Sequence, residues 1–176
     1  IMALPFDKLQ TKRLTLVPSS MEYCDDIYRE FTSEVARYMI PQPSEDKQDT
    51  VKFLQECQQA FELATDLEVI ILDSKNGEFL GCLGVLGLNR KTPSLGLWLK
   101  KSAWGQGYGK EAVQAALNWL SSYRQYRYVL YPVDRDNTAS RHLVESCGGI
   151  LDNVYAEKNT LGRVLNVCEY HIDLKQ

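Results

Sequence analysis

The segment Trp104-Gly105-Gln106-Gly107-Tyr108-Gly109-Lys110 places three glycines at alternate positions around the start of a predicted helix. The first amides of a helix have no intrahelical acceptor and carry a partial positive charge, so glycines at this point let an anion approach the backbone. A generic glycine-rich turn is the plainer alternative. The segment therefore predicts a phosphate-binding loop.

Two other kinds of phosphate loop do not fit this segment. A Walker loop needs a glycine five residues before Gly109 and Ser or Thr after Lys110, whereas the chain has Trp104 and Glu111 there. The dinucleotide pattern G-x-G-x-x-G would need its third glycine at Lys110, and the preceding strand belongs to an antiparallel hairpin. The pattern thus favours neither ATP hydrolysis nor NAD binding.

The residues on either side of the loop alternate between strand and helix patterns. Strands are predicted for residues 11–17, 67–72, 79–88, 95–99, 128–133, 150–155 and 164–174. Helices are predicted from a Ser19-Ser20-Met21-Glu22 capping box to about Met39, from about Glu45 through Phe61, and for residues 108–122 and 137–147. Leu14 and Leu16 share one face of the first strand, and Asn76-Gly77 predicts a hairpin turn.

These elements follow the order β-α-α-β-β-β-α-β-α-β-β. This order indicates an α/β (α+β) fold, a mixed and mostly antiparallel sheet with a central β-α-β unit flanked by helices. The glycine loop lies inside that unit. Such sheets bind ligands beyond the carboxyl ends of their strands, which is where the loop is expected.

Composition predicts one globular domain over residues 1–176, because 44% of the side chains are apolar and 24% are charged. A net charge of -3 gives no sequence-wide attraction to nucleic acid or to an anionic membrane, and no apolar run is long enough to cross a bilayer. The five cysteines are scattered and form no Cys-x-x-Cys pair. We therefore expect a soluble cytoplasmic protein with no metal site and a small partner.

The loop resembles that of the GNAT acyltransferases, whose cofactor loop runs Gln/Arg-x-x-Gly-x-Gly/Ala. Trp104 departs from the first position of that pattern. The stretch from Trp104 to Glu111 is most similar to the ribosomal-protein (Rim-type) branch of amine acetyltransferases, which often has Trp-Gly-x-Gly-Tyr, then Ala or Gly, then Glu. Residues 77–87 resemble the family's hairpin strand, Gly96-Leu97-Trp98-Leu99 its cofactor-pairing strand, and Asn137-x-x-Ser140 its later helix. The resemblance covers roughly residues 11 to 174.

By this resemblance the chain binds acetyl-CoA, with the diphosphate on the amides of the glycine loop and the pantetheine arm paired along a strand edge. The implied cofactor-binding residues are Leu97, Trp98, Leu99, Trp104, Gly105, Gln106, Gly107, Tyr108, Gly109, Lys110 and Asn137. For Trp98 and Trp104, core packing is the favoured interpretation. Lys110 either adds charge or is solvated. Asn137 suits a helix cap, a contact to the arm, or both.

The catalytic residues implied by the resemblance are Ser140 and Glu157. In the Rim-type branch a serine at this position is proposed to help protonate the departing thiolate, although a plain helical serine is the structural alternative. Many relatives have a tyrosine acid where this chain has Val144. Glu157 lies near the position of the branch's candidate base. Three further base candidates remain open: Glu68, Glu169 and His142.

The weak signal for a base bears on the acceptor. A lysine amine has a pKa about 2.5 units above that of a peptide α-amine, which adds roughly 3.4 kcal/mol to its deprotonation. The sequence therefore favours an N-acetyltransferase that uses direct attack by a primary amine, such as a peptide or protein N-terminus. The alternatives are a small amine (aminoglycoside or polyamine) as acceptor, or a CoA-binding module without catalysis. A homodimer is left open.

Overall fold

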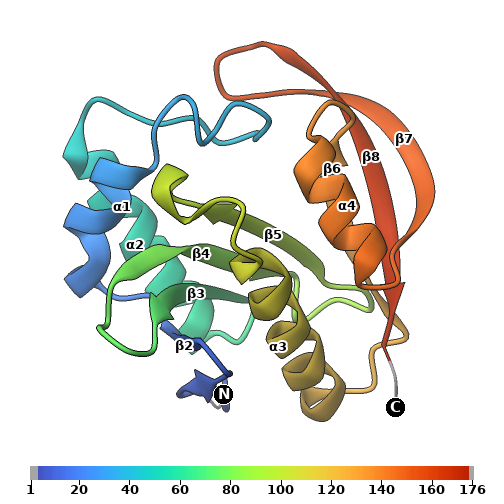
Figure 1. Cartoon of the computed structure of the whole chain (residues 1–176), viewed down its shortest axis with the longest axis horizontal. Coiled ribbons are helices and arrows are strands. Elements are labelled where there is room, and N and C mark those ends of the chain that lie inside the picture. The colour runs from blue at the N-terminus through green and yellow to red at the C-terminus, as the bar shows by residue number, and fades with distance from the viewer. Residues whose placement is uncertain (1–3, 175–176) are drawn as a thin grey trace.

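A mixed sheet runs through residues 4–174, the part of the chain that this computed structural model describes, in the order β1-β2-β3-β4-β5-β6-β8-β7 (Figure 1). The strands are β1 (Leu9–Gln10), β2 (Leu14–Pro18), β3 (Asp66–Asp73), β4 (Phe79–Leu86), β5 (Ser94–Leu99), β6 (Tyr128–Asp134), β7 (Ile150–Lys158) and β8 (Val164–Asp173). The helices are α1 (Cys24–Glu30), α2 (Lys47–Glu62), α3 (Tyr108–Tyr123) and α4 (Thr138–Ser146), with 3-10 turns η1 (Met21–Tyr23) and η2 (Lys101–Ala103).

The predicted order of elements and the mixed sheet are confirmed. Neighbouring strands pair antiparallel except β5 and β6, which are parallel and are joined through α3. This β5-α3-β6 crossover is the predicted central β-α-β unit. The added element is β1, whose two residues are too short to leave an alternation pattern in the sequence.

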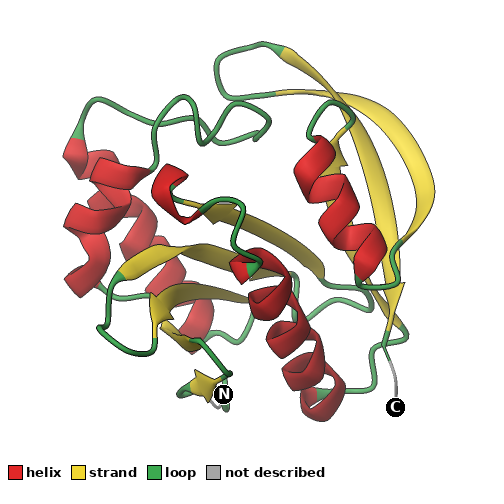
Figure 2. Cartoon of the chain, viewed as in Figure 1, coloured by secondary structure: helices red, strands yellow, loops and turns green. Residues whose placement is uncertain are grey.

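The two faces of the sheet carry different helices (Figure 2). α3 and α4 cover one face over the larger apolar core, and α1 and α2 cover the other face over a smaller one. Strand β3 serves both cores because its side chains alternate: Val69 and Ile71 face the larger core, whereas Ile70 faces the smaller. None of the helices in residues 4–174 has the length and apolar character needed to cross a membrane.

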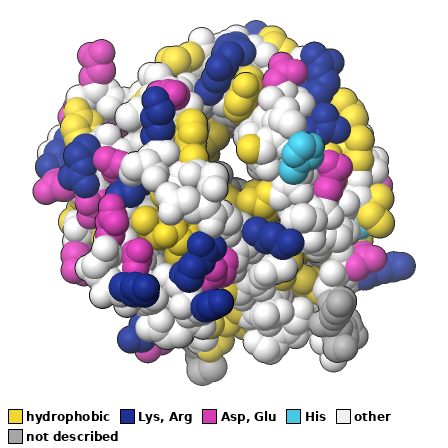
Figure 3. Space-filling model, viewed as in Figure 1, with side chains coloured by type: hydrophobic (Ala, Val, Ile, Leu, Met, Phe, Trp, Pro, Cys, Tyr) yellow, Lys and Arg dark blue, Asp and Glu magenta, His cyan; other side chains and the backbone are white. Residues whose placement is uncertain are grey.

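Strands β5 and β6 pair at one point, Ser94 opposite Leu130, and then separate. The amide of Leu130 donates to the carbonyl of Pro93 over 2.9 Å. The next bond of a parallel ladder would need an N–H at residue 132, but that residue is Pro132, which has none. The sheet therefore opens here, and Figure 3 shows the surface hollowed between the part that carries β5 and the part that carries α4.

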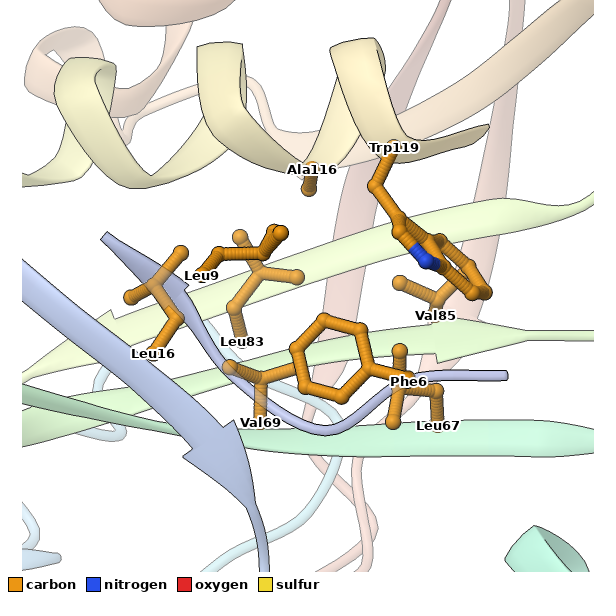
Figure 4. A pocket seen from close by; sticks show the side chains of 9 residues that line it. All are labelled: Phe6, Leu9, Leu16, Leu67, Val69, Leu83, Val85, Ala116 and Trp119. Atoms are coloured by element: carbon orange, nitrogen blue, oxygen red, sulfur yellow. The ribbon is translucent and has the colours of Figure 1, made fainter. Parts of the chain in front are cut away.

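The core between α3 and the sheet closes around a small apolar pocket (Figure 4). Ala116 and Trp119 of α3 face the strand side chains Leu83 and Val85 across it. The ring of Phe6, from the segment before β1, meets the Trp119 indole edge-on at 5.4 Å between centroids. This packing fixes α3, and with it the glycine loop, against the sheet.

The first helix is shorter than predicted. α1 ends at Glu30 rather than near Met39, and the chain enters η1 through Ser20, whose side chain makes no capping hydrogen bond, rather than through Ser19 of the predicted Ser19–Glu22 box. Phe31 leaves helical geometry and packs against the indole of Trp98, with ring centroids 5.0 Å apart. A tertiary contact therefore outweighs the local helical pattern at this point.

The connection that follows α1 crosses to the β7–β8 hairpin. The amide of Thr160 donates to the carbonyl of Ile40 over 2.9 Å, and the amide of Gln42 donates to the Thr160 hydroxyl over 3.1 Å. The two halves of the sheet are thus bridged on the side opposite α3. Helices α3 and α4 border the hollow between β5 and β6 on one side. The connection after α1 borders it on the other side.

Candidate functional site

The free edge of β5 beyond Ser94 borders the hollow. The amide of Lys100 donates to Leu80 of β4 over 2.8 Å, so by the two-residue period the main chains of Trp98 and Gly96 also face β4. Leu97 and Leu99 then direct their main-chain groups at the hollow. No strand among residues 4–174 pairs with this stretch.

The two tryptophans differ. Trp98 packs against Phe31 and against Phe79, whose ring centroid lies 5.8 Å away, in agreement with the packing interpretation. Trp104 is 45% exposed and so does not pack in the core. Its indole Nε1 donates to the Leu99 carbonyl over 2.8 Å, which anchors the start of the glycine loop to the end of β5.

The glycine loop reaches the start of α3 through two left-handed glycines and leaves that helix end uncapped. Gly105 and Gly107 have φ of 73° and 80°, a region that other residues rarely adopt. Gly107 is the residue at the N-cap of α3, and no side chain caps this end. The amides of Tyr108, Gly109 and Lys110 therefore lack an intrahelical acceptor and point out of the helix end.

Gly109 has a different reason to be glycine. A Cβ there would lie 2.8 Å from Leu143 of α4 and 2.9 Å from Leu97 of β5. The absence of a side chain lets α3 approach both elements. The third glycine of the motif thus lies where α3 packs closely against terminal methyl groups of α4 and β5, whereas the sequence pattern suggested ligand approach.

An arginine outside the motif holds this loop. Arg13, just before β2, donates from Nε to Glu111 Oε1 and from Nη1 to the Gln106 carbonyl, each over 2.8 Å. Glu111 also accepts from the Arg13 amide over 2.8 Å and from the Thr11 hydroxyl over 2.5 Å. Burial alone would raise the pKa of Glu111, but these hydrogen bonds outweigh it and lower the pKa. Sequence reasoning missed Arg13, because nothing local connects it to α3.

Helix α4 borders the hollow from the other side. Asn137 is its N-cap, and its side chain accepts a hydrogen bond from the Ser140 amide over 3.3 Å, so the capping interpretation is confirmed. The Ser140 hydroxyl lies 3.4 Å from the hydroxyl of Tyr131 on β6. Tyr131 is a second residue that the sequence analysis missed, because its alternation in β6 marks it only as a core residue.

The base candidates do not lie together. Glu157 is exposed on β7. Glu169 of β8 is half-buried and accepts from the Tyr155 hydroxyl over 3.3 Å. The β7–β8 register puts these three side chains on one face of the hairpin, opposite the face that packs on α4. His142 is exposed on α4.

Glu68 is in a different setting, on the α2 side of β3. Its carboxylate reaches over the neighbouring strand, so that a Cβ at Gly84 would lie 3.0 Å from Oε2. Burial, and secondarily the charge of Asp66, raises the pKa of Glu68 to about 7. Among residues 4–174 no three His, Cys, Asp or Glu side chains are grouped as metal ligands would be.

Solved acetyltransferases have this fold. RimJ of Mycobacterium smegmatis, in complex with CoA-disulfide, superposes with a TM-score of 0.86 at 16% identity, over 98% of this chain and 90% of that one. An acetyltransferase of Salmonella typhimurium that modifies the N-terminal serine of ribosomal protein L7/L12 superposes with a TM-score of 0.82 at 18% identity, over 94% of this chain and 97% of that one. Spermidine N-acetyltransferase of Vibrio cholerae, in complex with CoA and spermine, superposes with a TM-score of 0.80 at 16% identity, over 93% of this chain and 97% of that one. At these identities the likeness concerns the fold.

Sequence comparison gives the family. The uncharacterized protein YkkB of Bacillus subtilis (strain 168) is 32% identical over 79 residues, which span 43% of this chain and 46% of that protein, less than half of its length. A family model described as an acetyltransferase (GNAT) domain matches residues 13–150, most of the chain, including the glycine loop, β5 and Asn137 to Ser140. The chain belongs to the GNAT acetyltransferase family.

Proposed function

We propose that this chain moves the acetyl group of acetyl-CoA to a primary amine, with the donor bound in the hollow between β5 and β6. One observation carries the proposal: β5 has an edge without a neighbouring strand at Leu97 and Leu99, and Trp104 ties the end of that edge to the loop that leads to the free amides at the start of α3. The edge offers main-chain partners to an extended chain of amides, and the helix start offers donors to a diphosphate. A pantetheine arm followed by a diphosphate has that sequence of groups.

Acetyl-CoA, when bound, supplies an acetyl thioester as the activated acyl group. The amides from Gln106 to Lys110 would hold its diphosphate, with the Lys110 ammonium adding charge at the same helix end. The main-chain groups of Leu97 and the amide of Leu99 would pair with the arm, since the Leu99 carbonyl already accepts from Trp104. Asn137 caps α4 through its oxygen, so its amide nitrogen stays free to donate to the arm.

We propose Ser140 as the group that protonates the departing thiolate. Its position on the first turn of α4, facing β6, supports this role, and the Tyr131 hydroxyl gives its Oγ a hydrogen-bond partner. Val144, where relatives carry a tyrosine, is fully buried in the core and contributes no acid. Ser140 is thus the hydroxyl that α4 offers on this side.

For the base we propose Glu157, with Glu169 as the alternative on the same hairpin face. Both side chains lie on the side of β7–β8 that faces away from α4, where the connection after α1 also arrives. An acceptor amine that enters from that side would approach the thioester from the side away from α3. Comparison of Glu157→Gln with Glu169→Gln tests the choice, because removal of the base should abolish the acid limb of the kcat/KM profile against pH in one variant only.

The proposed acceptor is a peptide or protein N-terminal α-amine. Its pKa of about 7.7 to 8.0 leaves a useful unprotonated fraction at neutral pH, so an exposed carboxylate is a sufficient base. The Salmonella neighbour that modifies an N-terminal serine has the same fold, which supports this class. A polyamine is the second candidate, because the Vibrio cholerae neighbour is a spermidine acetyltransferase.

A panel assay tests the function. The purified chain would be incubated with acetyl-CoA and peptides with free N-termini, the same peptides with blocked N-termini and a lysine, spermidine, or an aminoglycoside. Thiol release with free N-termini alone supports the proposal, and release with spermidine alone moves the acceptor to the polyamines. Tight CoA binding by calorimetry without thiol release from any acceptor would identify a non-catalytic CoA-binding module.

Three broader expectations remain proposals. One domain over the 176 residues is supported by the sheet that continues from β1 to β7. A cytoplasmic location is supported by five free thiols, three of them buried, which suit a reducing compartment. A homodimer stays a prediction that sedimentation of the purified protein would test.

A further inference from the structure

The side chain of Arg13 reaches the glycine loop from a part of the chain that lies outside the loop motif. Its Nη1 donates to the carbonyl of Gln106 over 2.8 Å, and its Cζ lies 4.5 Å from the centroid of the Tyr108 ring. Its Nη2 lies on the Gly107 side of the loop, 3.4 Å from where a Cβ at that glycine would stand. Arg13 therefore contacts Gln106 and Tyr108 and lies beside the glycine between them.

The hydrogen bond to Gln106 fixes the direction of a peptide group. In a trans peptide the C=O and the following N–H point in opposite directions. When Arg13 holds the Gln106 carbonyl on one side, the Gly107 amide faces the other side. Glycines at 105 and 107 permit many conformations, so this peptide would rotate easily without a fixed partner.

Arg13 also balances a negative charge at the same helix end. Glu111 lies in the first turn of α3 and its side chain is 20% exposed. A carboxylate there would repel an incoming diphosphate over a short distance. The Arg13 guanidinium pairs with it over 2.8 Å, and the Thr11 hydroxyl adds a further hydrogen bond.

We infer that Arg13 is a positioning residue for the diphosphate-binding loop, acting through the Gln106 carbonyl and Glu111. It holds the Gly107 amide toward the side where the diphosphate binds and cancels the charge of Glu111. This inference rests on the proposed use of acetyl-CoA. It assigns a binding role to the segment before β2, which lies 93 residues before Gln106 in sequence.

A comparison of two acyl donors separates positioning from general stability. S-acetylpantetheine carries the thioester and the arm but no diphosphate. If Arg13 positions the loop, Arg13→Gln lowers the ratio of kcat/KM for acetyl-CoA to kcat/KM for S-acetylpantetheine by about tenfold, mainly through the KM for acetyl-CoA. Arg13→Lys keeps the positive charge but loses the forked N–H donors of the guanidinium. Its ratio of kcat/KM values for the two donors should therefore lie between those of Arg13→Gln and the parent.

Arg124→Gln is the matched control. Arg124 also stacks on a tyrosine, Tyr123, at 5.3 Å, but at the far end of α3. Its donor ratio should equal that of the parent. An equal loss with both donors in Arg13→Gln would make Arg13 merely structural, and an unchanged ratio would remove its role altogether. A parent protein that uses neither donor would instead overturn the proposed function itself.

Discussion

The hydroxyl of Tyr131 on β6 lies 3.4 Å from the hydroxyl of Ser140 on α4. Tyr131 is 1% exposed, and burial raises its pKa to about 12. It therefore stays protonated at neutral pH and can donate to Ser140 Oγ. The contact links the strand that borders the hollow to the helix that carries the proposed acid.

Removal of the Ser140 hydroxyl should lower turnover more than donor binding. In Ser140→Ala we expect kcat to fall about tenfold or more with a small change in the KM for acetyl-CoA, because the hydroxyl acts on the leaving group. Steady-state kinetics measures both. An unchanged kcat would assign Ser140 to the structure of α4.

Tyr131→Phe should reduce kcat by a smaller factor than Ser140→Ala, because it removes the partner and not the acid. Tyr126→Phe is the matched control, since Tyr126 is also buried and its hydroxyl donates to the Leu88 carbonyl over 2.6 Å, away from the hollow. Each variant loses one hydrogen bond of a buried tyrosine, about 1 kcal/mol of stability. Equal kcat values in the two would show that Tyr131 does not support Ser140.

Glycine replacements should separate binding from stability. Gly107→Ala puts a side chain at φ 80° in the loop, at a cost of about 1–2 kcal/mol, and should weaken acetyl-CoA binding. Gly109→Val adds two methyl groups beyond a Cβ that already lies within 3 Å of Leu143 and Leu97, and should lower the melting temperature more. Calorimetry with CoA and thermal unfolding measure the two effects.

Gly162→Ala is the control for backbone strain, because Gly162 has φ 83° with open space around it in the β7–β8 turn. It should lose stability like Gly107→Ala and retain full affinity for CoA. If Gly107→Ala also retained full affinity, the loop before α3 would not be the diphosphate site.

Pro132→Ala should narrow the opening of the sheet. The new N–H can donate to the Leu95 carbonyl and extend the parallel ladder by one bond. We expect the new amide to be protected in hydrogen exchange and the KM for acetyl-CoA to rise several-fold. Fast exchange at residue 132, with an unchanged KM, would mean that other contacts keep β5 and β6 apart.

The carboxyl of Glu68 should make stability depend on pH. Its pKa is raised from 4.5 to about 7 by burial and by Asp66, so the folded state retains a proton that the unfolded chain releases. The stability from this group is complete below about pH 4.5 and is lost as pH rises through about 7. Cys57 of α2 and Cys82 of β4 are the other titratable groups coupled to it, and the pKa of each thiol is raised mainly by burial.

Glu68→Gln cannot ionise, so it should match the parent near pH 4 and be more stable at pH 8, by about 3 kcal/mol. Urea unfolding at the two pH values measures the difference. Glu56→Gln, at an exposed position of α2, is the control and should change little at either pH. A parent as stable at pH 8 as Glu68→Gln would mean that Glu68 ionises freely in the fold.

Much of the fold followed from local patterns. The alternation that set Leu14 and Leu16 inward is confirmed by their burial, and the Asn76-Gly77 turn joins β3 to β4 as predicted. Helix α2 was predicted from spacing and begins after Asp46, which accepts from the Gln48 amide. The predicted C-terminal end of α1 was wrong, because Phe31 packs against the Trp98 indole and does not continue the helix.

The sequence by itself determined the order of the elements, the glycine loop and the family, because each depends on residues close together in the chain. Only the tertiary structure decided that Arg13 holds the loop, that Tyr131 meets Ser140, and that Gly109 packs closely against Leu143. Arg13 and Glu111 are 98 residues apart, and no periodicity extends that far. Such contacts exist only once the sheet has brought β2, β5 and α3 to one side of the hollow.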